Sequence, residues 1–199
     1  MRFPNAGPRA SGLSWNVSIV GDSNSDTATG VANGFTGWWL QLAALAAGSR
    51  FTIKTETYAT GGWKWEDAQA IASTINAAAT APRDCVLVML GTNNLDNNES
   101  ASSVLTKAAT FLAAMTNYQK RGLIWVLPQS ANSTRNAQVD AFNAGAASVA
   151  NCDFVVSRAG VTALSNSLDT TYFYDSLHIN GVGGASLASI TYSALQANL

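Results

Sequence analysis

The chain has 199 residues, of which 47% are hydrophobic and 12% are charged, and its formal net charge at pH 7 is −1. This length suits one domain that buries about 70% of the surface of the unfolded chain. A nearly neutral chain without a run of like charges offers no electrostatic surface for nucleic acid or anionic lipid. A small, weakly charged ligand is expected instead.

The predicted elements alternate between apolar, β-branched runs and alanine-rich stretches with helical spacing. In chain order they are strand 17–20, helix 38–47, strand 51–58, helix 65–79, strand 85–90, helix 102–118, strand 123–127, helix 137–149, strand 154–156 and helix 185–195. The third and fourth strands are apolar on both faces, as in a parallel sheet that helices cover on both sides. We therefore expect a three-layer α/β/α sandwich with a flavodoxin-like, five-stranded parallel sheet of order 2-1-3-4-5.

We expect a single domain over residues 1–199, in which residues 1–14 form an N-terminal extension or linker. The opening residues lack the apolar centre of a signal peptide, and no apolar run approaches the roughly 20 residues that span a bilayer. A soluble chain without membrane insertion is expected. Its compartment and oligomeric state stay open, because an export signal or further domains could belong to a longer protein.

Polar residues follow the first three strands, at the edge of an open parallel sheet where ligands bind. Ser23 follows the first strand and should lie near helix N-terminal N–H groups, although a turn or helix-capping serine also suits this position. Gly62 follows the second strand and Asn93 the third, and both residue types are also common in turns. A backbone N–H and a side-chain amide at these positions could stabilise an oxyanion beside a serine hydroxyl. Their occurrence at consecutive strand ends favours a catalytic site over unrelated turns.

His178 is the single histidine of the chain, and Asp175 precedes it by three residues. A carboxylate at that spacing can accept a hydrogen bond from the imidazole, and a histidine held in this way can serve as a base for a serine hydroxyl. A surface or structural histidine is the alternative. The polar residues at the strand ends favour the catalytic interpretation.

The segments GDSNS, ATGG, GTNN and DSLH resemble the four sequence blocks of the SGNH/GDSL hydrolases, in the family's order and over residues 17–184. The resemblance implies that Ser23 attacks an ester carbonyl, that His178 moves the serine proton to the leaving alcohol, and that Asp175 orients the imidazole. It also implies an acyl-enzyme that water hydrolyses. The oxyanion hole that it implies consists of the Ser23 N–H, the Gly62 N–H and the Asn93 side chain.

The chain departs from the family pattern at two positions. Asn94 stands where the third block often has aspartate, although asparagine also occurs there, notably in sequences similar to the platelet-activating-factor acetylhydrolases. Ile179 stands where proline is frequent after the histidine. Neither departure removes a group that the chemistry needs. The choice of Gly62 over Gly61 follows the family, whose donor usually falls on the second position of such a pair.

Substrate contacts are expected from Trp63, as a wall of the site, and from Asn94, whereas core packing is favoured for Trp38 and Trp39. No cofactor and no metal are expected, because one histidine and two separated cysteines make no zinc-ligand cluster and no phosphate-binding glycine loop is present. The two cysteines, Cys85 and Cys152, are not expected to form a disulfide.

A small domain without a visible lid predicts an open crevice that accepts short acyl groups on a bulky alcohol. We predict a short-chain acylesterase whose partner is a small-molecule or polysaccharide ester, with an acetylated carbohydrate as the first choice. The composition would also suit an extracellular bacterial or phage-tail-associated polysaccharide deacetylase. The alternatives are a lysophospholipase or thioesterase, an acyltransferase that uses the same residues, and a non-catalytic carbohydrate-binding module.

Overall fold

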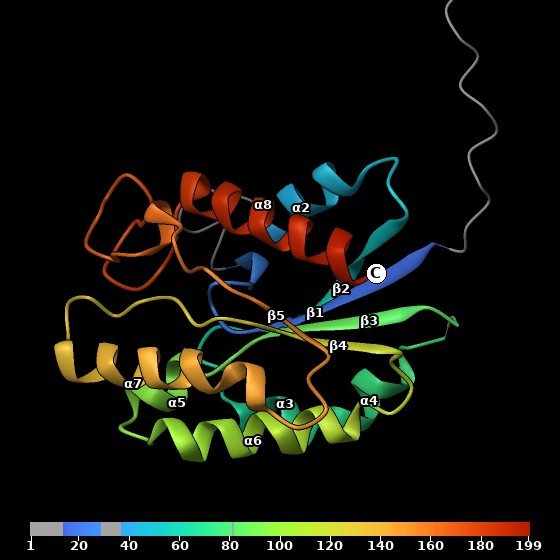
Figure 1. The fold of residues 1–199 in the computed structure, drawn as a ribbon, viewed down its shortest axis with the longest axis horizontal. Helices are drawn as coiled ribbons and strands as arrows, with labels where there is room; N and C mark the ends of the chain where they lie inside the picture. Colours follow the sequence, from blue (N-terminus) through green and yellow to red (C-terminus); the bar gives the residue numbers. More distant parts are fainter. Residues whose placement is uncertain (1–13, 29–36, 81) are drawn as a thin grey trace, which may run out of the picture.

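A five-stranded parallel sheet forms the centre of the protein, in the order β2-β1-β3-β4-β5 (Figure 1). The computed structural model describes residues 14–28, 37–80 and 82–199, so the predicted extension lies outside the described residues except for Ser14. The strands are β1 (Trp15–Gly21), β2 (Phe51–Ala59), β3 (Asp84–Met89), β4 (Lys120–Ile124) and β5 (Phe154–Val156). The predicted sheet order is confirmed.

Helices cover both faces of this sheet (Figure 1). One face carries α2 (Trp38–Ala46) and α8 (Gly181–Asn198), which pack against each other. The other face carries α3 (Trp65–Ala70), α4 (Ala72–Ala77), α5 (Thr92–Asp96), α6 (Ala101–Ala114) and α7 (Ser133–Gly145). Two short 3₁₀ turns, η1 (Ala146–Ser148) and η2 (Thr162–Leu164), lie in the C-terminal half of the chain. The predicted three-layer α/β/α sandwich is confirmed.

The sheet divides the apolar interior into two clusters, because successive strand side chains point to opposite faces. In β1, Ile19 packs with the α2 and α8 layer and Val20 with the opposite layer. Trp38 is fully buried in the first cluster, and its indole N–H donates to Ser25 Oγ at 3.2 Å. Trp39 is 6% exposed, so the core packing favoured for both tryptophans is confirmed.

Several helix boundaries differ from the prediction, and capping side chains explain two of the differences. The predicted helix 65–79 is two helices, α3 and α4, which meet at Ile71 (φ −112°, ψ 16°). Helix α7 begins earlier than predicted because the Asn132 side chain accepts a hydrogen bond from the Arg135 N–H. Helix α8 also begins earlier, because Asn180 Oδ1 accepts from the N–H groups of Val182 and Gly183.

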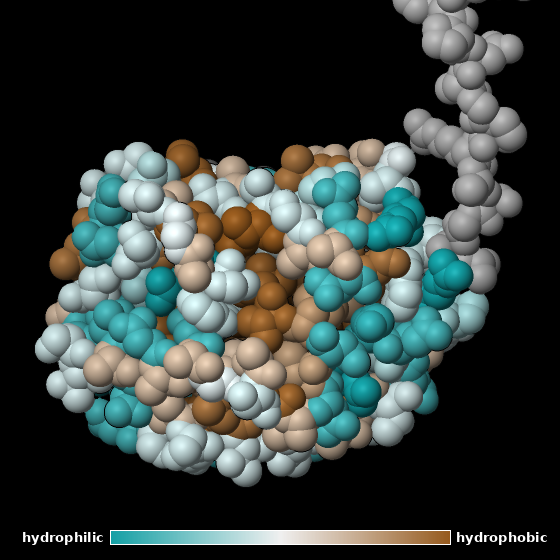
Figure 2. Space-filling view, viewed as in Figure 1, coloured by the Kyte–Doolittle hydropathy of each residue, from teal (hydrophilic) through white to brown (hydrophobic). Residues whose placement is uncertain are grey.

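The surface in Figure 2 mixes polar and weakly polar side chains over both helical layers, with a band of apolar side chains between the layers, over the edge strand β5. Within the described ranges, no helix is both long enough and apolar enough to cross a bilayer. Cys85 and Cys152 are both free thiols.

Candidate active site

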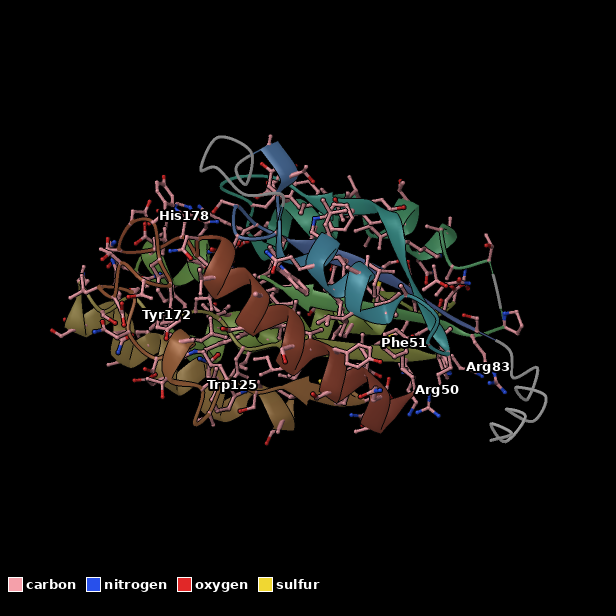
Figure 3. All side chains as sticks on the ribbon, turned by 90° about the horizontal axis from the view of Figure 1, so that it is seen from above. Arg50, Phe51, Arg83, Trp125, Tyr172 and His178 are labelled. Carbon is pink, nitrogen blue, oxygen red and sulfur yellow. The ribbon has the colours of Figure 1, made fainter. Side chains whose placement is uncertain are left out.

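The predicted site residues lie on loops that leave the carboxyl ends of the strands. Ser23 follows β1, Gly62 follows β2, and Asn93 lies in the first turn of α5, directly after β3. Figure 3 shows His178 toward one end of the molecule and Arg50, directly before β2, toward the opposite end. Parallel topology therefore brings these loops to one edge of the sheet.

Ser23, His178 and Asp175 form a continuous hydrogen-bonded chain. Ser23 Oγ lies 2.9 Å from His178 Nε2, although 155 positions separate the two residues in the sequence. On the other side of the ring, His178 Nδ1 lies 2.8 Å from Asp175 Oδ2. This is the connectivity that a serine nucleophile, a general base and an orienting carboxylate require.

Asp175 is held by its own loop as well as by the histidine. Its Oδ1 accepts hydrogen bonds from the backbone N–H of Leu177 at 2.7 Å and of His178 at 2.6 Å. Burial alone would raise the pKa of Asp175, but the hydrogen bonds from the His178 ring and these two amides together lower the pKa below its usual value. The carboxylate therefore stays ionised and keeps the imidazole in one orientation.

Asn24 joins the nucleophile turn to the histidine loop, a role that the sequence analysis missed. Its side chain accepts a hydrogen bond from the Ile179 N–H at 3.1 Å and donates to the Leu177 carbonyl at 3.4 Å. Asn24 is only 3% exposed. Because these partners flank His178, Asn24 fixes the position of the imidazole relative to Ser23. The adjacency of Asn24 to Ser23 is the one sequence signal that could have suggested it.

Asp22, which precedes the nucleophile, is fully buried. Its Oδ1 accepts a hydrogen bond from the Asn24 N–H at 3.1 Å. Burial raises the pKa of Asp22 to about 6, although the Asn24 amide, the Thr92 side chain and the charge of His178 partly offset this effect. The carboxyl group therefore changes protonation in a mildly acidic range, next to the serine.

The second strand ends in a tight turn that exposes Gly62. The Trp63 N–H donates to the Thr60 carbonyl at 3.2 Å, and Gly62 has a φ of 82°, in the left-handed region that glycine adopts without strain. A Cβ at Gly62 would meet no atom within 4 Å, so the need for glycine comes from its backbone conformation and not from crowding.

Asn93 is partly buried, and its Nδ2 donates to the Trp63 carbonyl at 2.9 Å. An amide nitrogen carries two hydrogens, so this bond orients the group and leaves a second N–H for a ligand. The bond also ties the loop after β3 to the loop after β2. Two of the predicted oxyanion donors therefore belong to one connected structure.

Asn94 is inaccessible to a ligand, and the prediction that it contacts the substrate is wrong. The residue is fully buried, and its Oδ1 accepts a hydrogen bond from the Trp65 N–H at 3.1 Å. Its Nδ2 donates to Glu66 at 3.0 Å and to Glu99 at 2.8 Å. Every polar group of this side chain is therefore used inside the protein.

Trp63 is partly buried and packs against the apolar cluster on the α3 and α6 side of the sheet. Its contact with substrate stays a prediction.

A pocket of 120 Å³ lies beside the histidine loop and is lined in part by Ser176 and Leu177. A larger groove of 370 Å³, between α3 and α6, is lined by none of the three residues of the hydrogen-bonded chain. Among the described residues, no group of three or more histidine, cysteine, aspartate or glutamate side chains could hold a metal ion.

Comparison with known proteins finds similarity at the level of structure. Neither a protein-family model nor a curated protein sequence matches the chain. A variant of an acetyl-xylooligosaccharide esterase from Geobacillus is similar over 92% of this chain and 95% of that chain, with 14% identity and a TM-score of 0.72. A lipolytic protein of the G-D-S-L family from Veillonella parvula is similar over 92% and 99%, with 15% identity and a TM-score of 0.72.

A third solved structure with this fold is a psychrotrophic esterase from Pseudoalteromonas, which is similar over 92% of this chain and 97% of that chain, with 14% identity and a TM-score of 0.67. At such identities the likeness establishes a common fold. The activity of this chain has to be argued from its own side chains.

Proposed function

We propose that this protein is a serine esterase of the SGNH/GDSL type that hydrolyses short-chain acyl esters. The main support for the proposal is the continuous series of hydrogen bonds from Ser23 Oγ through the His178 ring to Asp175. The order of the four sequence blocks supports it, as does the esterase fold of the similar structures.

The proposed reaction begins when Ser23 Oγ attacks the carbonyl carbon of the ester and His178 Nε2 takes the hydroxyl proton. The negative charge that develops on the carbonyl oxygen is stabilised by the N–H groups of Ser23 and Gly62 and by the Asn93 amide. Imidazolium then gives its proton to the leaving alcohol, and an acyl-enzyme remains. Water, deprotonated by His178, attacks this ester and releases the acid and the free serine.

Hydrolysis of p-nitrophenyl acetate, butyrate and octanoate by the wild type and by Ser23→Ala tests the proposal. We expect the substitution to lower kcat by about 10⁴-fold to 10⁶-fold, because the nucleophile acts as a unit with its base. Ser73→Ala, at an exposed position on α4, is the matched control and should keep wild-type rates. Equal, near-background rates for the wild type and Ser23→Ala would refute the esterase proposal.

We propose an acetylated carbohydrate as the natural substrate. A partly exposed indole beside the oxyanion turn is suited to stacking on a sugar ring, and one similar structure is an acetyl-xylooligosaccharide esterase. Trp63→Ala should raise KM for an acetylated xylooligosaccharide by about tenfold, which corresponds to about 1.4 kcal/mol of stacking energy. It should leave KM for p-nitrophenyl acetate nearly unchanged. Faster turnover of octanoate than of acetate would favour the lysophospholipase or thioesterase alternative.

A further inference from the structure

Four side chains, from α3, from α5 and from α6 with the residues just before it, form a closed polar ring behind the predicted oxyanion hole. Asn94 lies in α5, Glu66 in α3, Glu99 just before α6, and Lys107 within α6. Asn94 Nδ2 donates to Oε2 of Glu66 and to Oε1 of Glu99. Lys107 Nζ donates to the other oxygen of each carboxylate, so that two donors and two carboxylates alternate around the ring.

Both carboxylates of this ring are ionised at neutral pH. Burial alone would raise the pKa of Glu66, but its hydrogen bonds with Lys107 and Asn94 lower the pKa to about 2. The pKa of Glu99 is lowered first by its hydrogen bond with Lys107 and further by that with Asn94. The Asn94 amide therefore donates both of its hydrogens to negative charges, and hydrogen bonds to charged acceptors are the stronger kind.

Asn94 is connected to the oxyanion turn by its oxygen. Asn94 Oδ1 accepts from the Trp65 N–H at 3.1 Å, and the neighbouring Asn93 donates to the Trp63 carbonyl at 2.9 Å. These two consecutive residues of α5 therefore hold residues 63–65, the segment that directly follows Gly62. We therefore expect a shift of Asn94 to displace this segment and, with it, the adjacent Gly62 and the Asn93 amide bonded to it.

We propose that Asn94 is a positioning residue that sets the geometry of the oxyanion hole. The polar ring accepts only an amide at position 94. The inference rests on the proposed esterase function. An aspartate at this position would still accept from the Trp65 N–H, but it could not donate to Glu66 or Glu99. It would also place a third carboxylate against the single ammonium group of Lys107. The two glutamates thus account for asparagine in this chain, at a position where the family often has aspartate.

The test compares Asn94→Asp with the double variant Asn94→Asp/Glu99→Gln. The single variant changes the size of the side chain little, and we expect kcat for p-nitrophenyl acetate to fall by about tenfold to 100-fold, less than the loss of a whole oxyanion donor. KM should change by less than about twofold, because a displaced oxyanion donor weakens transition-state binding and leaves ground-state binding nearly intact. In the double variant the new amide at position 99 can donate to the new carboxylate at position 94, and the charge of the ring returns to the wild-type value. Its kcat should recover by about tenfold.

Asn97→Asp is the matched control, because it makes the same chemical change at an exposed position directly after α5. It should keep kcat within about twofold of the wild type. Circular dichroism and thermal unfolding of each variant separate a local displacement from global unfolding. If Asn94→Asp does not fold, Lys107→Met provides the test. This substitution leaves both hydrogen bonds of the Asn94 amide in place but removes the cation between the two carboxylates. We expect kcat to fall several-fold at constant KM.

The rate of inactivation by an alkyl fluorophosphonate is a second readout, because the phosphoryl oxygen of the adduct with Ser23 would occupy the oxyanion hole. This rate should fall in parallel with kcat. A folded Asn94→Asp protein with wild-type kcat would overturn the positioning role. A double variant no faster than the single variant would also overturn it. If Asn94→Asp does not fold, an unchanged kcat for Lys107→Met would overturn it. Each of these outcomes leaves Ser23-dependent turnover by the wild type intact. Absence of that turnover would instead refute the esterase proposal, and with it any role of Asn94 in the reaction.

Discussion

Replacing the buried carboxyl group of Asp22 should change how the stability of the protein depends on pH. The pKa of Asp22 rises from its usual value of 3.8 to about 6 in the folded state, chiefly because the group is fully buried. A difference of about 2 pKa units corresponds to about 3 kcal/mol. The folded state binds the proton more tightly than the unfolded state, so this stabilisation is fully present below pH 3.8 and is lost as the pH rises through 6.

Asp22→Asn removes this loss, because the amide is neutral at every pH and its oxygen can still accept from the Asn24 N–H. We expect the free energy of unfolding of the variant, relative to that of the wild type, to increase by about 2 to 3 kcal/mol between pH 4 and pH 8. Urea unfolding of both proteins at half-unit pH intervals measures the difference. Parallel pH profiles would refute the reasoning, because they would mean that Asp22 ionises equally easily in the folded and unfolded chains.

Three further substitutions test other parts of the structure. Asp175→Asn should lower kcat by about 10⁴-fold with KM nearly constant, since the imidazole loses its orienting carboxylate; steady-state kinetics that show a loss below about tenfold would contradict this role. Gly62→Ala should lower the free energy of unfolding by about 1 to 2 kcal/mol, because alanine must adopt a φ of 82°; equal urea midpoints would argue against strain at this turn. Gly183→Ala should lower it by about 1 to 3 kcal/mol, because the added Cβ would lie 2.2 Å from the Tyr172 carbonyl oxygen; an unchanged melting temperature would show that α8 can shift freely.

Much of the fold could be predicted because its signals are local. Strand β3 is apolar after Asp84, and the apolar run 123–127 overlaps the end of β4, which begins three residues earlier than predicted, at Lys120. Such runs are typical of a parallel sheet between two helical layers. Alternation of strands and helices then leaves few topologies, among which the order 2-1-3-4-5 is a common one. The early starts of α7 and α8 were missed although their signals are local too. Asn132 and Asn180 are good N-caps that stand directly before the helices they begin.

The candidate nucleophile, base and oxyanion donors could be proposed from sequence because each stands at a strand end or within a short polar block, positions that parallel topology brings together. The residues that hold them could not. Asn24 and Asn94 are both asparagines in polar loops, where a turn role is the ordinary expectation. Their hydrogen-bond partners lie up to 155 positions away in the sequence, at Ile179 for Asn24 and at Trp65, Glu66 and Glu99 for Asn94.

The sequence by itself therefore determined the layers of the fold and the residue types that the chemistry needs, because hydrophobic periodicity and strand-end position act over a few residues. Only the tertiary structure decided which polar side chains stay partly exposed at this edge of the sheet and which are buried. Asn93 and Asn94 are adjacent and chemically identical, yet the amide nitrogen of Asn93 donates to one backbone carbonyl, whereas that of Asn94 donates to two glutamates. Burial and charge at such a position are set by segments that meet only when the chain is folded, so no local pattern encodes them.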